Sequence, residues 1–257
     1  IDIGGSAGTT VGTNMTESAS IMGFQATGDA LNVDGITYSF PLGGATVVVG
    51  DTTDISSTFT GACAYSAFTD YMGNCGTGNS VGVGGKGVTA SIGYAFDSGF
   101  SLAGGVSSTE TAIMTKEGTD TYGIEAAYNA DTYGVAVAYV SVDNAAAAET
   151  TYWGVNGFYD FDLASLSVGV ETEETSGADK SGYFVGLTFP EVGPGSVSVG
   201  LGTQANYLDS ETELLTYEAS YSYPINDGMT VTPGVYIKEA SSGDDDTGLI
   251  VKTSFSF

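Results

Sequence analysis

The chain has 257 residues, of which 42% are apolar and only 14% are charged, whereas soluble domains typically have roughly 25% charged residues. Its formal net charge is −26, from 31 acidic residues against five lysines, with no histidine. This balance excludes nucleic-acid binding, which needs clustered basic side chains. It also leaves no histidine for acid–base chemistry and no convergent nucleophile–base set, so we expect no enzyme.

Segments of about ten residues with a two-residue alternation follow one another along the chain. This pattern is typical of β-strands with one apolar and one polar face. We expect a weak strand near 1–11 and further strands at 18–27, 32–42, 45–54, 87–96, 99–108, 121–130, 133–142, 150–161, 164–173, 180–189, 196–205, 213–225, 229–240 and 247–257. No apolar run approaches the roughly 20 residues that a membrane-spanning helix needs.

The connections between these strands alternate in length. Short turns are expected at 41–44, 96–99, 130–132, 160–163, 190–195 and 224–228, and longer polar loops at 55–79, 107–120, 143–149, 173–180, 204–213 and 239–247. Short turns at one rim and long loops at the other are typical of up-and-down barrels in the bacterial outer membrane. A soluble sandwich has no reason to sort its loops by length.

The polar face of most strands consists of Gly, Ser, Thr and Ala with an occasional Glu or Lys. A soluble barrel of this size would fill its interior with Val, Leu and Ile and place its charges outside. We therefore predict an all-β fold, in which residues 1–257 form one transmembrane antiparallel β-barrel with apolar residues facing lipid and a hydrated interior. A soluble protein with an apolar core is the alternative.

The expected strands are odd in number, whereas single-chain bacterial barrels have even numbers. Either the first strand is misplaced, which gives 14 strands, or one strand precedes Ile1, which gives 16. We favour 16, so that a chain beginning at Ile1 is a fragment. The last segment, DTGLIVKTSFSF (246–257), resembles the closing strand of an outer-membrane barrel because it alternates and then ends on phenylalanine.

Segment 57–79 shows neither a strand nor a helix period, and it contains the only two cysteines, Cys63 and Cys75. An even pair within one short loop fits a disulfide formed outside the cytosol, and two free thiols are the alternative. If the segment folds inward, it narrows the pore, with Asp70 and Tyr71 at the constriction. A loop that only covers the outer mouth is the competing prediction.

The alternation also assigns the side chains that point into the barrel. It predicts as pore-lining residues Glu125, Glu171, Glu218, Tyr236, Lys238 and Lys252, with Asn129, Thr216 and Thr230 as neutral lining. The leading hypothesis is a passive diffusion channel for inorganic ions and small hydrophilic solutes that needs no cofactor. The acid excess predicts a preference for cations, although salt screens loop charges within about 8 Å.

Several stretches resemble the barrel of the cyanobacterial outer-membrane porins, the iron-uptake porin group that is related to the carbohydrate-selective porins. They are YSFPLG (38–43), CGTGN (75–79), GTDTYGIEAAYNADTYGVAVAY (118–139), GPGSVSVGLGT (193–203), YSYPINDGMTVTPGVY (221–236) and TGLIVKTSFSF (247–257). The resemblance implies uptake of iron, other ions or sugars by a porin, commonly a homotrimer, in outer-membrane lipid. It also implies an SLH domain and a coiled coil upstream, both absent here, and early-strand arginines that this chain lacks.

The second hypothesis comes from a different functional class. An acidic surface-layer or adhesin protein would use loop acids such as Asp244, Asp245 and Asp246 to bind calcium. A porin would need detergent for extraction, whereas a surface-layer protein would be released by a chelator. The sequence leaves the transported solute and the oligomeric state open.

Overall fold

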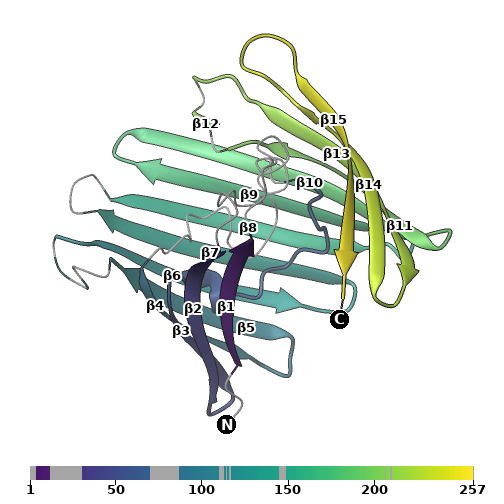
Figure 1. Ribbon diagram of the computed structural model, residues 1–257. Coiled ribbons are helices and arrows are strands. Elements are labelled where there is room, and N and C mark those ends of the chain that lie inside the picture. The colour runs from purple at the N-terminus through teal and green to yellow at the C-terminus, as the bar shows by residue number, and fades with distance from the viewer. Residues whose placement is uncertain are drawn as a thin grey trace.

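The computed structural model describes residues 4–11, 31–69, 87–109, 113, 115, 117–144, 149–205, 207–208 and 210–256. Their strands form one 15-stranded antiparallel sheet in which neighbours follow the chain from β1 to β11 and then β13, β14 and β15, while β12 pairs with β10. The sheet curls around a central space (Figure 1). Within the described ranges, no helix is long and apolar enough to cross a membrane.

The elements have the following bounds: β1 (Gly4–Val11), β2 (Leu31–Leu42), β3 (Ala45–Asp51), the 3-10 helix η1 (Ile55–Thr58), β4 (Val88–Ala95), β5 (Phe100–Ser108), β6 (Thr119–Asn129), β7 (Tyr133–Asn144), β8 (Thr150–Asp160), β9 (Ser165–Thr175), β10 (Ala178–Val192), β11 (Gly195–Thr203), β12 (Tyr207–Leu208), β13 (Leu215–Asn226), β14 (Met229–Lys238) and β15 (Asp246–Phe255). The predicted all-β, up-and-down order is confirmed.

The first strands leave the strand count open. β1 pairs directly with β2, with Gly4 opposite Ser39 and Val11 opposite Leu31. The expected strand at 18–27 lies outside the described residues. Since no pairing between β1 and β15 occurs in the described part of the sheet, the choice between 16 and 14 strands stays a prediction.

One predicted loop was wrong. Residues 173–180 form the paired ends of β9 and β10, joined by a two-residue turn at Ser176 and Gly177 with φ of 26° and 91°. Positive φ at both turn positions is what a tight hairpin requires. Glu173 lies opposite Lys180, and their side chains form an ion pair of 3.2 Å. The polar residues of this stretch therefore belong to the end of a hairpin, whose two strands stay paired up to the turn.

The two faces of the sheet differ as the alternation predicted. The outward face exposes large apolar side chains, including Ile36, Ile92, Leu102, Ile124, Val135, Val155, Val170, Val235 and Leu249. The inward face buries small or polar ones, including Thr89, Ser91, Ala127, Ala136, Ala138, Ser167 and Thr216. An exposed apolar surface of this extent needs lipid to cover it, because soluble proteins rarely expose one. The transmembrane orientation is thus confirmed, and the soluble alternative is wrong.

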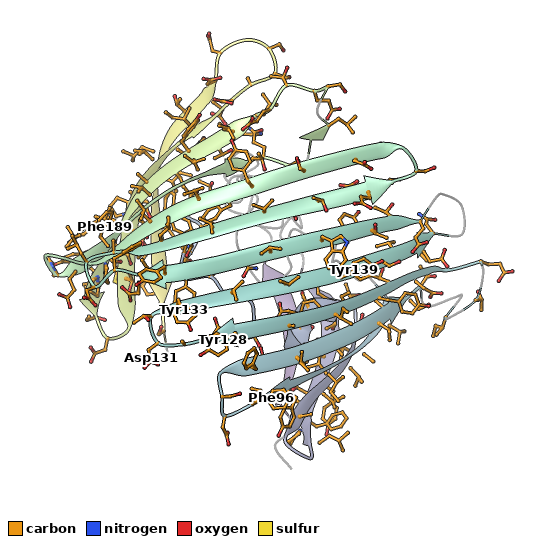
Figure 2. All side chains as sticks on the ribbon, turned by 180° about the vertical axis from the view of Figure 1, so that it is seen from behind. Phe96, Tyr128, Asp131, Tyr133, Tyr139 and Phe189 are labelled. Atoms are coloured by element: carbon orange, nitrogen blue, oxygen red, sulfur yellow. The ribbon has the colours of Figure 1, made fainter. Side chains whose placement is uncertain are left out.

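Aromatic side chains mark both rims of the outward face. Ring pairs at the short-turn rim are Tyr94–Phe96, Phe100–Tyr128 and Tyr159–Phe161, with centroids 4.7, 4.7 and 4.6 Å apart. Toward the opposite rim, Tyr139 lies 4.8 Å from Trp153. Figure 2 shows Tyr128, Tyr133 and Phe189 near one end of the sheet and Tyr139 toward the other. Aromatic girdles at two levels indicate the two interfaces of a membrane.

Candidate pore constriction

After β3 the chain turns into the barrel. Residues 55–69, which we call the inner segment, cross the inward face from β4 to β14 (Figure 1). The predicted inward folding of 57–79 is therefore found for its described part, 57–69. Asp70, Tyr71 and Cys75 lie outside the described residues, so the constriction residues and the disulfide of Cys63 with Cys75 stay predictions.

The first anchor of the inner segment is on β6. The backbone N–H groups of Thr60 and Gly61 donate to Oε1 of Glu125, at 2.6 and 3.1 Å. The side-chain amide of Asn129, four residues further along β6, donates to the carbonyl of Gly61 at 2.9 Å. Irregular backbone inside a barrel must find such partners, because it has no ladder of its own.

Two neutral side chains on the following strands also hold the inner segment. Asn156 of β8 accepts a hydrogen bond from the backbone N–H of Ala62 at 2.7 Å. Ser167 of β9 accepts one from the N–H of Ala64 at 3.0 Å. The inner segment is thus held at successive strands rather than at a single point.

The strongest anchor is Glu218 of β13. Its Oε1 accepts from the hydroxyl of Tyr65 at 2.8 Å and from the N–H of Phe68 at 2.6 Å. Its Oε2 accepts from the N–H and the hydroxyl of Thr69, at 2.8 and 2.7 Å. Four donors around one carboxylate compensate the cost of burying its charge.

Tyr65 is placed to remain a donor in this cluster. Burial raises the pKa of the Tyr65 phenol, and the charge of Glu218 together with their hydrogen bond raises it further. The phenol therefore stays protonated over the ordinary pH range, and its hydrogen points at the carboxylate. Its ring packs on Phe184 of β10 at a centroid distance of 5.0 Å.

Inward glycines make room for the inner segment. A Cβ at Gly186 or Gly200 would lie 2.5 or 2.6 Å from Tyr65, and one at Gly234 would lie 2.5 Å from the ring of Phe68. Gly186 and Gly200 stand directly opposite each other on β10 and β11. Because a side chain at these positions would occupy the space of an aromatic ring, the wall and the inner segment fit only with glycine there.

Three of the predicted pore-lining residues lie on the inward face but are covered. Glu125 and Glu218 are each 4% exposed, and Tyr236 is 5% exposed. The two carboxylates hold the inner segment, whereas the Tyr236 hydroxyl points at Asp246, 3.4 Å from Oδ1. Glu125 and Glu218 therefore hold the inner segment in position, and none of the three side chains is open to the space inside the barrel.

The other three predicted residues are half-buried on the same face. Glu171 lies on β9 between Gly154 and Gly182 of the neighbouring strands. Lys238 stands opposite Asp246, and Lys252 stands on β15 opposite a threonine of β14. These side chains remain our candidates for contact with the lumen water.

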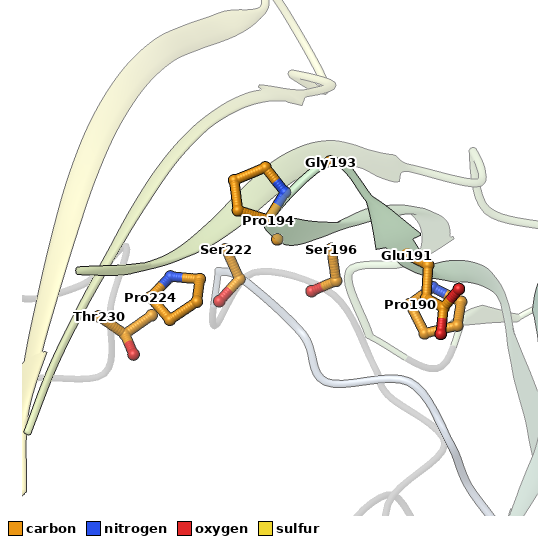
Figure 3. A pocket seen from close by; sticks show the side chains of 9 residues that line it. Pro190, Glu191, Gly193, Pro194, Ser196, Ser222, Pro224 and Thr230 are labelled. Carbon is orange, nitrogen blue, oxygen red and sulfur yellow. The ribbon is translucent and has the colours of Figure 1, made fainter. Parts of the chain in front are cut away.

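A pocket of about 540 Å³ opens near the short-turn rim of β10, β11, β13 and β14 (Figure 3). Hydroxyls of Ser196, Ser222 and Thr230 line it together with three prolines. Pro190 and Pro224 sit where the β10–β11 and β13–β14 ladders slip register. Proline has no N–H to donate to a ladder, and within sheets it is often found at irregularities of this kind.

The acidic loop before β15 shows no metal geometry. Asp245 accepts a hydrogen bond from the N–H of Ala240 at 3.1 Å, and Asp246 faces Tyr236. Among the described residues, no three acidic, cysteine or histidine side chains are grouped so that they could hold a metal ion. Calcium at Asp244, Asp245 and Asp246 stays a prediction.

None of the protein-family models and none of the curated proteins compared with this chain match it. Solved structures do. The anion-selective porin from Comamonas acidovorans aligns with a TM-score of 0.65 and 13% identity, over 90% of this chain and 80% of its own. A loop-deletion variant of OmpT, an outer-membrane protein of Vibrio cholerae, gives 0.67 and 12% over 90% and 82%. A variant of the Rh. blastica porin gives 0.59 and 16% over 90% and 81%.

This chain has the fold of the bacterial outer-membrane porins. A porin barrel with an apolar outer band and aromatic girdles resides in the outer membrane, because its backbone polar groups are paired within the sheet and its exposed side chains suit lipid. The resemblance to the cyanobacterial iron-uptake group gains no support from these structures and stays a prediction.

Sequence reasoning found the two carboxylate anchors but gave them another role. It missed Asn156 and Ser167, since a lone amide or hydroxyl on an inward face looks like ordinary polar lining. A usable signal was present in Gly186 and Gly200. Glycines at inward positions of adjacent strands indicate that something large lies against the wall.

Proposed function

We propose that this protein is an outer-membrane porin, a passive diffusion channel for inorganic ions and small hydrophilic solutes. The observation that supports this proposal is the inner segment, which follows a small, polar inward face and is hydrogen-bonded to it from β6 to β13. A wall of this composition is hydrated, and a segment laid along it reduces the width available to solutes. Selection then depends on width and charge without any chemical step.

We further propose that the channel prefers cations. The formal net charge of −26 favours this sign. On the inward face the charge of Glu173 is paired with that of Lys180 at 3.2 Å, whereas Glu125 and Glu218 lie behind the inner segment and accept its hydrogen bonds. An acidic side chain that is ionised near the lumen attracts cations through its field, and salt screens it less there than on the outer surface.

Reconstitution into planar bilayers tests both parts of the proposal. We expect stepwise conductance increments and, under a salt gradient, a reversal potential of the sign given by cation permeation. Absence of conductance from protein that shows a heat-modifiable barrel band would overturn the channel. Anion selectivity would overturn only the charge argument. Chemical cross-linking in the membrane tests the homotrimer, which we retain as part of the proposal.

A further inference from the structure

The membrane-facing side of β7, β8 and β9 contains an apolar groove with a volume of about 310 Å³. The groove exists because Gly157 occupies an outward position in β8. Val135 of β7 and Val168 of β9 stand directly opposite Gly157 on either side. Because glycine has no side chain, the backbone of β8 is uncovered between these two valines.

The rows above and below complete the walls. Toward the long-loop rim, Val155 is paired with Val137 and Val170, and toward the short-turn rim, Tyr159 is paired with Tyr133 and Leu166. Side chains that line the groove are Val135, Val155, Tyr159, Leu166, Val168 and Val170. All but Leu166 of these are exposed, so the groove is open to the membrane along its length.

The size and position of the groove match one leaflet. Val155 and Tyr159 are four residues apart on β8, so the groove extends about 14 Å along the strand at ~3.4 Å per residue. Strands of such barrels tilt by about 35–45°, so this length spans roughly 10–11 Å of height, somewhat under half of the apolar band, which is roughly 25 Å tall. The groove ends at Tyr159, whose ring packs against that of Phe161 at the short-turn rim. Short turns face the periplasm.

We propose that this groove binds one acyl chain of a phospholipid from the periplasmic leaflet. A linear apolar depression that extends through most of one leaflet complements a single hydrocarbon chain. The Tyr159 ring at its end lies at the level where the glycerol and headgroup begin, as interfacial tyrosines do. A second copy of this chain would meet the groove with separate side chains at every other position of its strands and leave part of the groove unfilled, and unfilled space forfeits packing.

The outward position of Gly104 on β5 provides a contrast within the same sheet. It lies opposite Ile92 and Ile124, and a Cβ there would meet Ile124 at 3.7 Å. At Gly104 a methyl group of Ile124 lies over the glycine, whereas the nearest atoms to a Cβ at Gly157 are all backbone. A gap open to lipid therefore depends on the neighbours as well as on the glycine.

Photo-cross-linking tests the proposal with the intact protein in phospholipid vesicles. A phospholipid with a diazirine in one acyl chain is activated, and labelled peptides are mapped by mass spectrometry. We expect saturable labelling of β8 and β9 that excess unlabelled phospholipid competes away. Val168→Phe fills the groove and should lower this labelling roughly tenfold, the effect of about two methylene groups losing their burial. Val235→Phe, an equally exposed control on β14, should not change it.

Two results would overturn the proposal. One is labelling of β8 and β9 that does not saturate, or that Val168→Phe leaves unchanged in protein whose barrel band remains heat-modifiable. The other is efficient disulfide formation between chains through Val155→Cys in the membrane, because a second copy would then occupy the groove. Saturable labelling in the unaltered protein does not depend on any variant, so a folding defect cannot imitate it.

Discussion

Replacement of Glu218 by glutamine should release the end of the inner segment from the wall. Glutamine keeps one oxygen and can accept from two of the four donors, while its nitrogen faces the other two. Hydrogen bonds to a charged group contribute about 1.5–3 kcal/mol each, so losing two costs roughly 3–6 kcal/mol of docking free energy. At 1.4 kcal/mol per factor of ten, the docked state loses about 10²–10⁴ in its ratio to the released state.

Hydrogen exchange and single-channel recording measure this release. The N–H groups of Phe68 and Thr69 both donate to Glu218, so their exchange should accelerate by about a hundredfold or more, in line with the lost docking energy. The single-channel conductance should rise and its open-state noise increase. Glu173→Gln is the matched control, because it removes one inward-face charge and leaves the bonds at Glu218 intact. Unchanged exchange at Phe68 and Thr69 in Glu218→Gln would refute the reasoning.

Three further changes test the wall, the charge and the disulfide. Gly200→Val should displace Tyr65, whose hydroxyl oxygen lies 2.6 Å from the new Cβ, cost about 1–3 kcal/mol and widen the pore. Gly104→Val meets its nearest atom at 3.4 Å and should leave conductance unchanged. Lys252→Glu should shift the reversal potential further toward cations, and an unchanged potential would remove Lys252 from the lumen. If Cys63 and Cys75 form a disulfide, mass spectrometry of the unreduced protein should find a cystine-linked peptide pair that Cys63→Ser abolishes, and absence of the pair from the unaltered protein would disprove the assignment.

The fold was predictable because the membrane imposes one rule on every strand. Lipid requires apolar residues at alternate positions. This rule produces a two-residue alternation that is visible in the sequence, as where Val135 and Val137 flank the small Ala136. The hairpin at 176–177 was not predictable from polarity, because strands that are paired to the turn carry the same polar residues as loops. The pairing of Glu173 with Lys180 keeps this polar stretch in strand conformation, although its composition is typical of a loop.

The candidate site was predictable only in part, because its contacts join residues far apart in the chain. The two-residue alternation placed Glu125 and Glu218 on the inward face, and the structure agrees. The alternation could not show that the inner segment covers both side chains, because it predicts only which face of the sheet a side chain is on. That information depends on the inner segment, whose own sequence has no period.

The anchors of the inner segment also impose an order on assembly. Its hydrogen bonds reach partners 65 residues away at Glu125, 94 at Asn156, 103 at Ser167 and 150 at Glu218. Closing each contact costs more chain entropy than the one before, and each partner belongs to a later strand. We therefore expect the inner segment to dock on β6 before it docks on β13, so that the lumen takes its final width only when β13 has joined the sheet.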